Sequence, residues 1–73
     1  MSMNFAVNYD SNSGIDYDFC FSTLREAYRF YNRLPVVPFK SLTFDHPKNG
    51  TITLLNSKGE NNLKKYFCLI DYA

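Results

Sequence analysis

The sequence predicts an α+β fold, in which a mostly antiparallel sheet carries one helix packed on one face. Two hydrophobic periods in the 73 residues lead to this prediction. Apolar residues alternate with polar ones in several short runs, as in strands with one buried face, and they recur at helical spacing in the stretch from Ser22 to Pro35. The connections are of hairpin length, which favours antiparallel pairing. The expected order is therefore β-β-α-β-β-β.

The first two strands are predicted from strict alternation. From Met3 to Tyr9, and again from Ile15 to Phe21, every second residue is apolar, which is the pattern of a strand with one side in the core. Between them, Asp10 to Gly14 has turn chemistry, because its polar side chains bond locally to the backbone and its glycine accepts positive φ. We therefore expect a hairpin whose outward side carries Asp16 and Asp18.

The helix is predicted from agreeing start, period and stop signals. Thr23 followed by Glu26 fits a capping box, and Pro35 disfavours helical geometry at the residue before it. Between these signals, apolar groups follow the i, i+3, i+4, i+7 spacing of one helix face. This apolar stripe consists of Leu24, Ala27, Tyr28, Tyr31 and Leu34.

The rest of the sequence predicts three further strands. The last of them is apolar on both faces, which is typical of a strand that is central in a sheet or covered on both faces by other parts of the protein. An apolar area on the uncovered side of the last two strands would make a homodimer or partner surface. The expected segments are an extended connector at Pro35–Pro38, strands at Phe39–Asp45, Thr51–Leu55 and Leu63–Tyr72, a turn at His46–Gly50 and a polar loop at Asn56–Asn62.

Length and composition limit the function classes. The chain has room for one domain, residues 1–73, and its 45% hydrophobic and 18% aromatic content argues against disorder. A formal net charge of +1 provides no overall field for nucleic acid or an acidic membrane. No signal-peptide pattern is seen, and no apolar run approaches the roughly 20 residues of a membrane span, so we expect a cytoplasmic protein without membrane contact.

Few residues are candidates for catalysis. His46 is the only histidine and lies in a turn, and Cys20 and Cys68 lie far apart in strand-like runs, where we expect reduced thiols. Asp16 and Asp18 project from one side of a strand and could share a metal ion or a proton, although such pairs are more typical of solvated surface charges. We expect no enzyme, cofactor or metal, and a metal-assisted enzyme is the last-ranked alternative.

Charged side chains supply the candidate binding residues. Arg25, Arg29 and Arg33 lie on the helix side opposite the apolar stripe, and a row of guanidinium groups can pair with carboxylates of a partner protein or with phosphates. The commoner explanation of such a row is a solvated helix surface. Asp16 and Asp18, with tyrosines nearby, also suit contact with a basic protein surface.

The segment from Asp18 to Pro35 combines an Asp-Phe pair, a Ser-Thr cap and a Phe-Tyr-x-x-Leu-Pro end, at Asp18, Phe19, Ser22, Thr23, Phe30, Tyr31, Leu34 and Pro35. In this order it resembles the strand-into-helix element of some small phage-encoded anti-CRISPR proteins. The resemblance implies a non-enzymatic inhibitor that covers a surface of a host defence complex, and it assigns no binding residue in this chain. We therefore expect a small protein-binding module, with a nucleic-acid-binding domain that uses the arginines on phosphates as the alternative.

Overall fold

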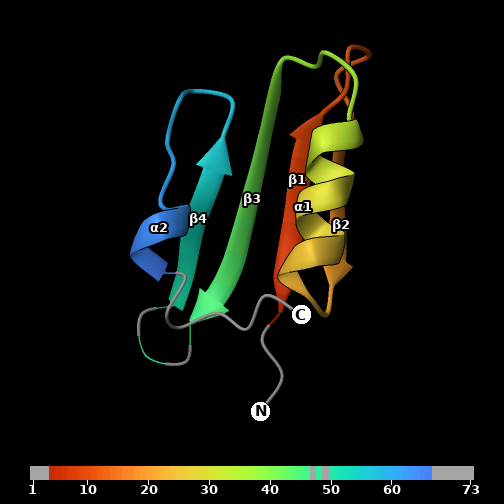
Figure 1. Cartoon of the computed structure of the whole chain (residues 1–73). Helices are drawn as coiled ribbons and strands as arrows, with labels where there is room; N and C mark the ends of the chain where they lie inside the picture. Colours follow the sequence, from red (N-terminus) through yellow and green to blue (C-terminus); the bar gives the residue numbers. More distant parts are fainter. Residues whose placement is uncertain (1–3, 47, 49, 67–73) are drawn as a thin grey trace.

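A computed structural model describes residues 4–46, 48 and 50–66. This part of the chain forms an antiparallel sheet with strand order β2-β1-β3-β4, one main helix α1 and a short helix α2 (Figure 1). The α+β prediction and the order of its first five elements are confirmed. The elements are β1 (Phe5–Asp10), β2 (Asp16–Phe21), α1 (Leu24–Arg33), β3 (Phe39–His46), β4 (Gly50–Asn56) and α2 (Leu63–Tyr66).

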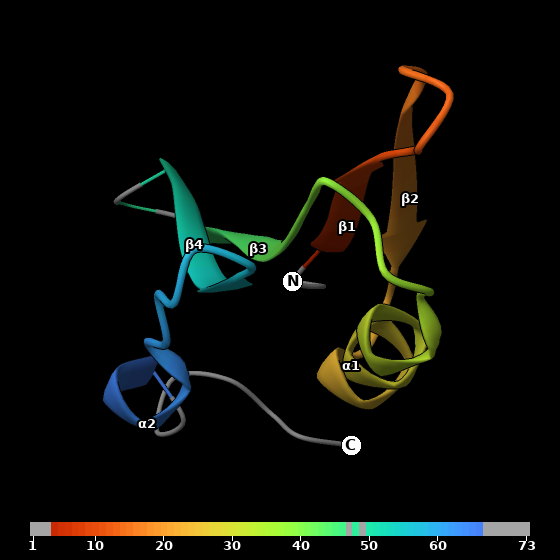
Figure 2. The same ribbon diagram turned by 90° about the horizontal axis from the view of Figure 1, so that it is seen from above.

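Both helices lie on the same side of the sheet (Figure 2). The register of β1 with β2 runs from Phe5 opposite Phe21 to Asp10 opposite Asp16. Since side chains alternate across a strand, the odd-numbered residues of both strands face the helices and the even-numbered residues face away. We call the side without helices the open face.

Local capping fixes where α1 begins and ends. The Thr23 side chain accepts a hydrogen bond from the Glu26 backbone N–H, with an N···O distance of 3.2 Å. The same hydroxyl donates to Glu26 Oε1 at 3.2 Å, so the carboxylate reaches back to the hydroxyl and not to the Thr23 amide. At the other end, Leu34 is extended, with ψ 138°, directly before Pro35. The helix therefore has the predicted start and stops one residue early.

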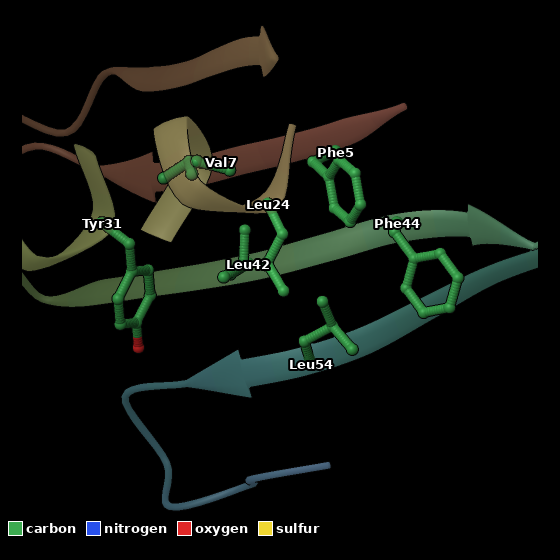
Figure 3. Close-up of a cluster of buried hydrophobic side chains, with 8 residues drawn as sticks. Phe5, Val7, Leu24, Tyr31, Leu42, Phe44 and Leu54 are labelled. Atoms are coloured by element: carbon green, nitrogen blue, oxygen red, sulfur yellow. The ribbon is translucent and has the colours of Figure 1, made fainter. Parts of the chain in front are cut away.

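The core lies between α1 and the three strands β1, β3 and β4. Leu24 projects from α1 toward the side chains of the sheet in Figure 3. Lys40 holds the last turn of the helix to β3, because its Nζ donates to the Tyr31 carbonyl oxygen at 3.2 Å and lies 4.4 Å from the centroid of the Tyr31 ring. The buried residues are Phe5, Val7, Leu24, Ala27, Tyr31, Leu42, Phe44 and Leu54.

An irregularity in β4 brings an extra side chain into this core. Leu42 of β3 lies opposite Leu55, but the next residue, Thr43, lies opposite Thr53. Leu54 is therefore the additional residue of a β-bulge, and it is completely buried.

The outer edge of β4 is covered by the chain that follows it. The Asn62 N–H donates to the Leu54 carbonyl oxygen at 2.7 Å, and the Asn62 Nδ2 donates to the Thr53 carbonyl oxygen at 2.9 Å. Closer to the turn, the Asn56 N–H donates to the Glu60 carbonyl oxygen at 3.2 Å. The returning segment therefore takes the backbone positions that a further strand would use.

The prediction of a strand at Leu63–Tyr72 is wrong for the residues Leu63–Tyr66. Residues Leu63–Tyr66 form α2, and the remainder of the predicted strand lies outside the described residues. The Leu63 N–H donates to Asn61 Oδ1 at 3.2 Å, a local side-chain bond of the kind that favours the start of a helical turn. Leu63 also packs against the core, so its apolar side chain is satisfied without a strand.

The apolar area expected on the uncovered side of the last two predicted strands is not found on the first of them, which is β4, and most of the second lies outside the described residues. The open face of β4 carries polar residues, because Thr53 lies opposite Thr43 and Thr51 lies opposite Asp45. Phe39 of β3, which lies opposite Asp10, is an apolar residue on this face. The Thr51 hydroxyl donates to Asp45 Oδ1 at 3.0 Å. This part of the sheet therefore gives no support to a homodimer.

The buried bulge residue gives a test of the core. We expect Leu54→Ala to lower the free energy of unfolding by about 2 to 5 kcal/mol, because it leaves a cavity at a site that is 0% exposed. Val36→Ala is the matched control, since Val36 is 93% exposed and its loss should change stability by no more than about 0.5 kcal/mol. Urea unfolding followed by circular dichroism measures both, and equal values would contradict the described core.

Candidate protein-binding surfaces

β2 is an edge strand, and its outer side is not covered by any described segment (Figures 1 and 2). The Ser11 N–H donates to the Ile15 carbonyl oxygen at 2.8 Å. Hydrogen-bonded and non-bonded positions alternate along an antiparallel pair, so the backbone groups of the odd-numbered residues of β2 point toward β1. The N–H and C=O groups of Asp16, Asp18 and Cys20 therefore point outward, toward solvent.

Aromatic side chains line the helix side of this strand, and we call them the aromatic row. Phe30 of α1 packs between Phe19 and Phe21, with ring centroids 5.0 and 5.3 Å apart, and Tyr9 stacks on Tyr17 at 5.2 Å. Rings at these separations attract one another beyond the area that they bury. The row therefore ties α1 to β2. It consists of Tyr9, Tyr17, Phe19, Phe21 and Phe30.

Part of this row remains exposed after α1 has packed. Tyr17 and Phe19 are 39% and 40% exposed, and Ile15, on the same side of the hairpin, is 52% exposed. Isolated apolar residues are common on protein surfaces, but neighbouring ones along a strand form a patch. These three side chains give the edge of β2 an apolar border on its helix side.

The open face beside this edge is acidic. Asp16 and Asp18 are exposed on β2, Asp10 lies opposite Asp16 on β1, and Asp45 lies on β3. The only lysine or arginine in the four strands, Lys40, faces the helix side. Lys58, in the loop after β4, has its Nζ 5.6 Å from the centroid of the Phe39 ring, and Phe39 lies opposite Asp10, so this lysine offsets part of the negative charge near Asp10. The excess of carboxylates at β2 still creates a negative potential beside this edge.

Two carboxyl groups of this face, those of Asp10 and Asp16, lie opposite each other at the turn end of the hairpin. A hydrogen bond with the Asp16 side chain raises the pKa of Asp10, and partial desolvation and the charge of Asp16 act in the same direction. A proton shared between the two carboxyl groups is therefore favoured in the folded chain. Above the raised pKa the Asp10 carboxyl group loses this proton and is repelled by the charge of Asp16.

The arginines lie on a different surface. Arg25, Arg29 and Arg33 are exposed on the outer side of α1, and no ion pair links them to another described residue. The sheet separates them from Asp16 and Asp18, which face away from the helices. The five residues predicted to bind a partner are thus all exposed, but they form two separate surfaces of opposite charge.

Within residues 4–46, 48 and 50–66, no group of three or more His, Cys, Asp and Glu side chains could hold a metal ion. His46 ends β3, and its Nδ1 accepts a hydrogen bond from the Lys48 N–H at 3.1 Å. Cys20 is a free, exposed thiol on the open face.

Sequence reasoning did not identify Phe30 or the exposed backbone of β2 as part of a surface. Phe30 could have been found, because it follows Ala27 by three positions and precedes Leu34 by four, which places it at the edge of the apolar stripe. The edge position of β2 could not have been predicted in this way, because it depends on the pairing of β1 with β3, which are separated in the sequence by β2 and α1.

No family model, curated protein or solved structure matches the chain. Neither helix in the described part of the chain has the length and apolar character needed to cross a membrane. Function must therefore be inferred from the geometry of the two surfaces.

The Asp10–Asp16 pair predicts a pH dependence of stability. The pKa of Asp10 is higher in the folded chain than its usual 3.8, so the shared proton stabilises the fold below that value, and this contribution is lost as the pH rises through the raised pKa. Asp10→Asn can donate the same hydrogen bond at any pH. We expect this variant to melt at a higher temperature than the wild type at about pH 7, and at nearly the same temperature at about pH 3. An advantage of equal size at both pH values would contradict this explanation.

Proposed function

We propose that the chain is a small, non-enzymatic protein-binding module that acts by covering a surface of a larger partner. One observation carries the proposal: the exposed Tyr17 and Phe19 border an uncovered edge strand that also bears Asp16 and Asp18. Aromatic side chains are enriched in the centres of protein interfaces, and polar or charged residues form their rims. The arrangement of these four residues is that of such a centre with an acidic rim.

The aromatic row could instead serve only to hold α1 on the sheet. Phe21 and Phe30 fit that role, because both are half-buried and in contact with each other. Tyr17 and Phe19 do not need to be so exposed for packing alone, and a rigid aromatic ring loses little conformational entropy when a partner covers it. Their exposed area supports a binding role beyond packing.

The class of partner comes from the resemblance of Asp18 to Pro35 to anti-CRISPR proteins. On that resemblance, we extend the proposal to a phage or mobile-element inhibitor that acts in the host cytosol on a protein of a defence complex. Covering a surface requires no catalytic group, which agrees with the side chains available at β2.

A second candidate function, nucleic-acid binding, is favoured by the arginines of α1. The three guanidinium groups are exposed on one side of one helix, and they are separated from the acidic open face by the sheet. Guanidinium groups pair bidentately with phosphates, and a local basic surface can bind nucleic acid although the net charge is only +1.

The proposed function predicts that Tyr17 is needed for partner binding. We expect Tyr17→Ser to reduce retention of a specific partner by about 30-fold, the size of effect seen for an aromatic residue at an interface centre. The measurement is affinity capture from lysate of cells that carry the gene, quantified by mass spectrometry and followed by direct titration of the retained protein.

Val36→Ser is the matched control for this experiment, because it also removes an exposed apolar side chain but lies outside the aromatic row. It should retain the partner as the wild type does. If Tyr17→Ser, Val36→Ser and the wild type retain the same proteins in the same amounts, the β2 surface is not the binding site.

The nucleic-acid candidate predicts a strong salt dependence. Three phosphate contacts would give a slope of roughly −2.7 for log K against log salt on a DNA duplex, and Arg29→Glu should reduce the magnitude of this slope by about 1 or more. Lys58→Glu makes the same change in net charge in the loop after β4 and should have a smaller effect. Fluorescence anisotropy with duplex DNA and RNA measures both, and no binding at low salt would exclude this candidate.

A further inference from the structure

We propose that the partner adds an antiparallel strand to the outer edge of β2, and that this strand alternates basic residues with apolar ones. The inference rests on the proposed function and specifies how the β2 surface recognises its partner. It combines three properties of the same strand: outward backbone groups, an acidic side and an apolar side.

The two edges of the sheet differ in how far their outer backbone groups are bonded in the described part of the chain: β4 is bonded along its second half, from Thr53 to Asn56, whereas β2 is not bonded on its outer side. The backbone of β4 is bonded on its outer side by the returning chain, through Asn62 to Leu54 and through Glu60 to Asn56. None of the hydrogen bonds found in the described part of the chain uses the outward N–H or C=O groups of Asp16, Asp18 and Cys20. An added strand can satisfy these groups, as in other cases of strand addition.

The side chains of β2 determine the chemistry of the added strand. In an antiparallel pair, the residue hydrogen-bonded opposite Asp18 points its side chain to the same face as Asp18. Arginine or lysine at that position, and opposite Asp16, would face the acidic open face, where Asp10 and Asp45 add to the negative potential. The intervening residues lie on the helix side, beside Tyr17 and Phe19, where apolar side chains are favoured.

A second copy of the chain fits this edge less well than a basic partner. Pairing of β2 with β2 of another molecule would place Asp16 and Asp18 of both copies on one face, in adjacent strands, where like charges oppose pairing. Charge complementarity therefore favours a different protein. Antiparallel addition is specified because every strand pair in the described sheet is antiparallel.

The test uses a capped peptide of about seven residues in which Arg and Val alternate. In the proposed complex the backbone groups of the Arg residues face β2, whereas those of the Val residues face solvent. Two N-methylated versions of this peptide form a matched pair, one methylated on two Arg amides and the other on two Val amides. Binding to the full chain is measured by nuclear magnetic resonance titration.

We expect methylation of the Arg amides to weaken binding by roughly tenfold to a hundredfold, and methylation of the Val amides to change it little, because only the former removes hydrogen bonds to β2. The unmethylated peptide should slow hydrogen exchange at the amides of Asp16, Asp18 and Cys20. The double variant Asp16→Asn with Asp18→Asn should bind the Arg peptide more weakly than the wild-type chain does. For a peptide with Thr in place of Arg, the affinities of the double variant and of the wild-type chain should be the same.

Other results overturn the inference without overturning the proposed function. Equal binding of the two methylated peptides, or protection confined to other amides, would exclude strand addition, and no binding of the Arg peptide would exclude the basic partner strand. Protection of the β2 amides that grows with protein concentration in the absence of peptide would identify a second copy as the occupant. In each case the effect of Tyr17→Ser on partner capture still decides the proposed function.

Discussion

Packing of α1 against one side of the sheet is the interaction on which the other features depend. A chain of 73 residues buries only roughly 60% of its unfolded surface, so it can form one small core. Leu24, Ala27 and Tyr31 supply the helical part of that core, and the strands supply the rest. Because both described helices lie on one side, the other side of the sheet meets water and must be polar.

This one-sided packing also separates the charges. The acidic residues of β1, β2 and β3 lie on the open face, whereas Arg25, Arg29 and Arg33 lie on the outer side of the helix. The charges of these two surfaces have opposite signs and nearly cancel in the formal net charge of +1. The molecule presents carboxylates on one side and guanidinium groups on the other, and total charge alone gives no guide to this separation.

Local patterns predicted most of the fold, because alternation, capping and proline each act over a few residues. Thr23 and Pro35 set the limits of α1 to within one residue, and the first hairpin follows from its alternation and turn. Long-range pairing is not encoded in this way. The alternation from Leu63 onward indicated a strand, but Asn62 and its neighbours already pair with β4, so the chain enters a helical turn instead.

For the candidate surfaces, too, the sequence predicted the local properties of the residues but not the properties that depend on strand order. Exposure of the charged residues follows from the faces of a helix and a strand, and the structure places all five of them at the surface. The role of β2 as an edge depends on strand order, which brings β3 next to β1 across the intervening helix. The closed outer side of β4 has a consequence for assembly, since edge-to-edge polymerisation requires two free edges on each molecule. If β2 adds a partner strand as proposed, the bonded second half of β4 would oppose further edge-to-edge growth, and the complexes should have a fixed one-to-one stoichiometry and not grow into filaments.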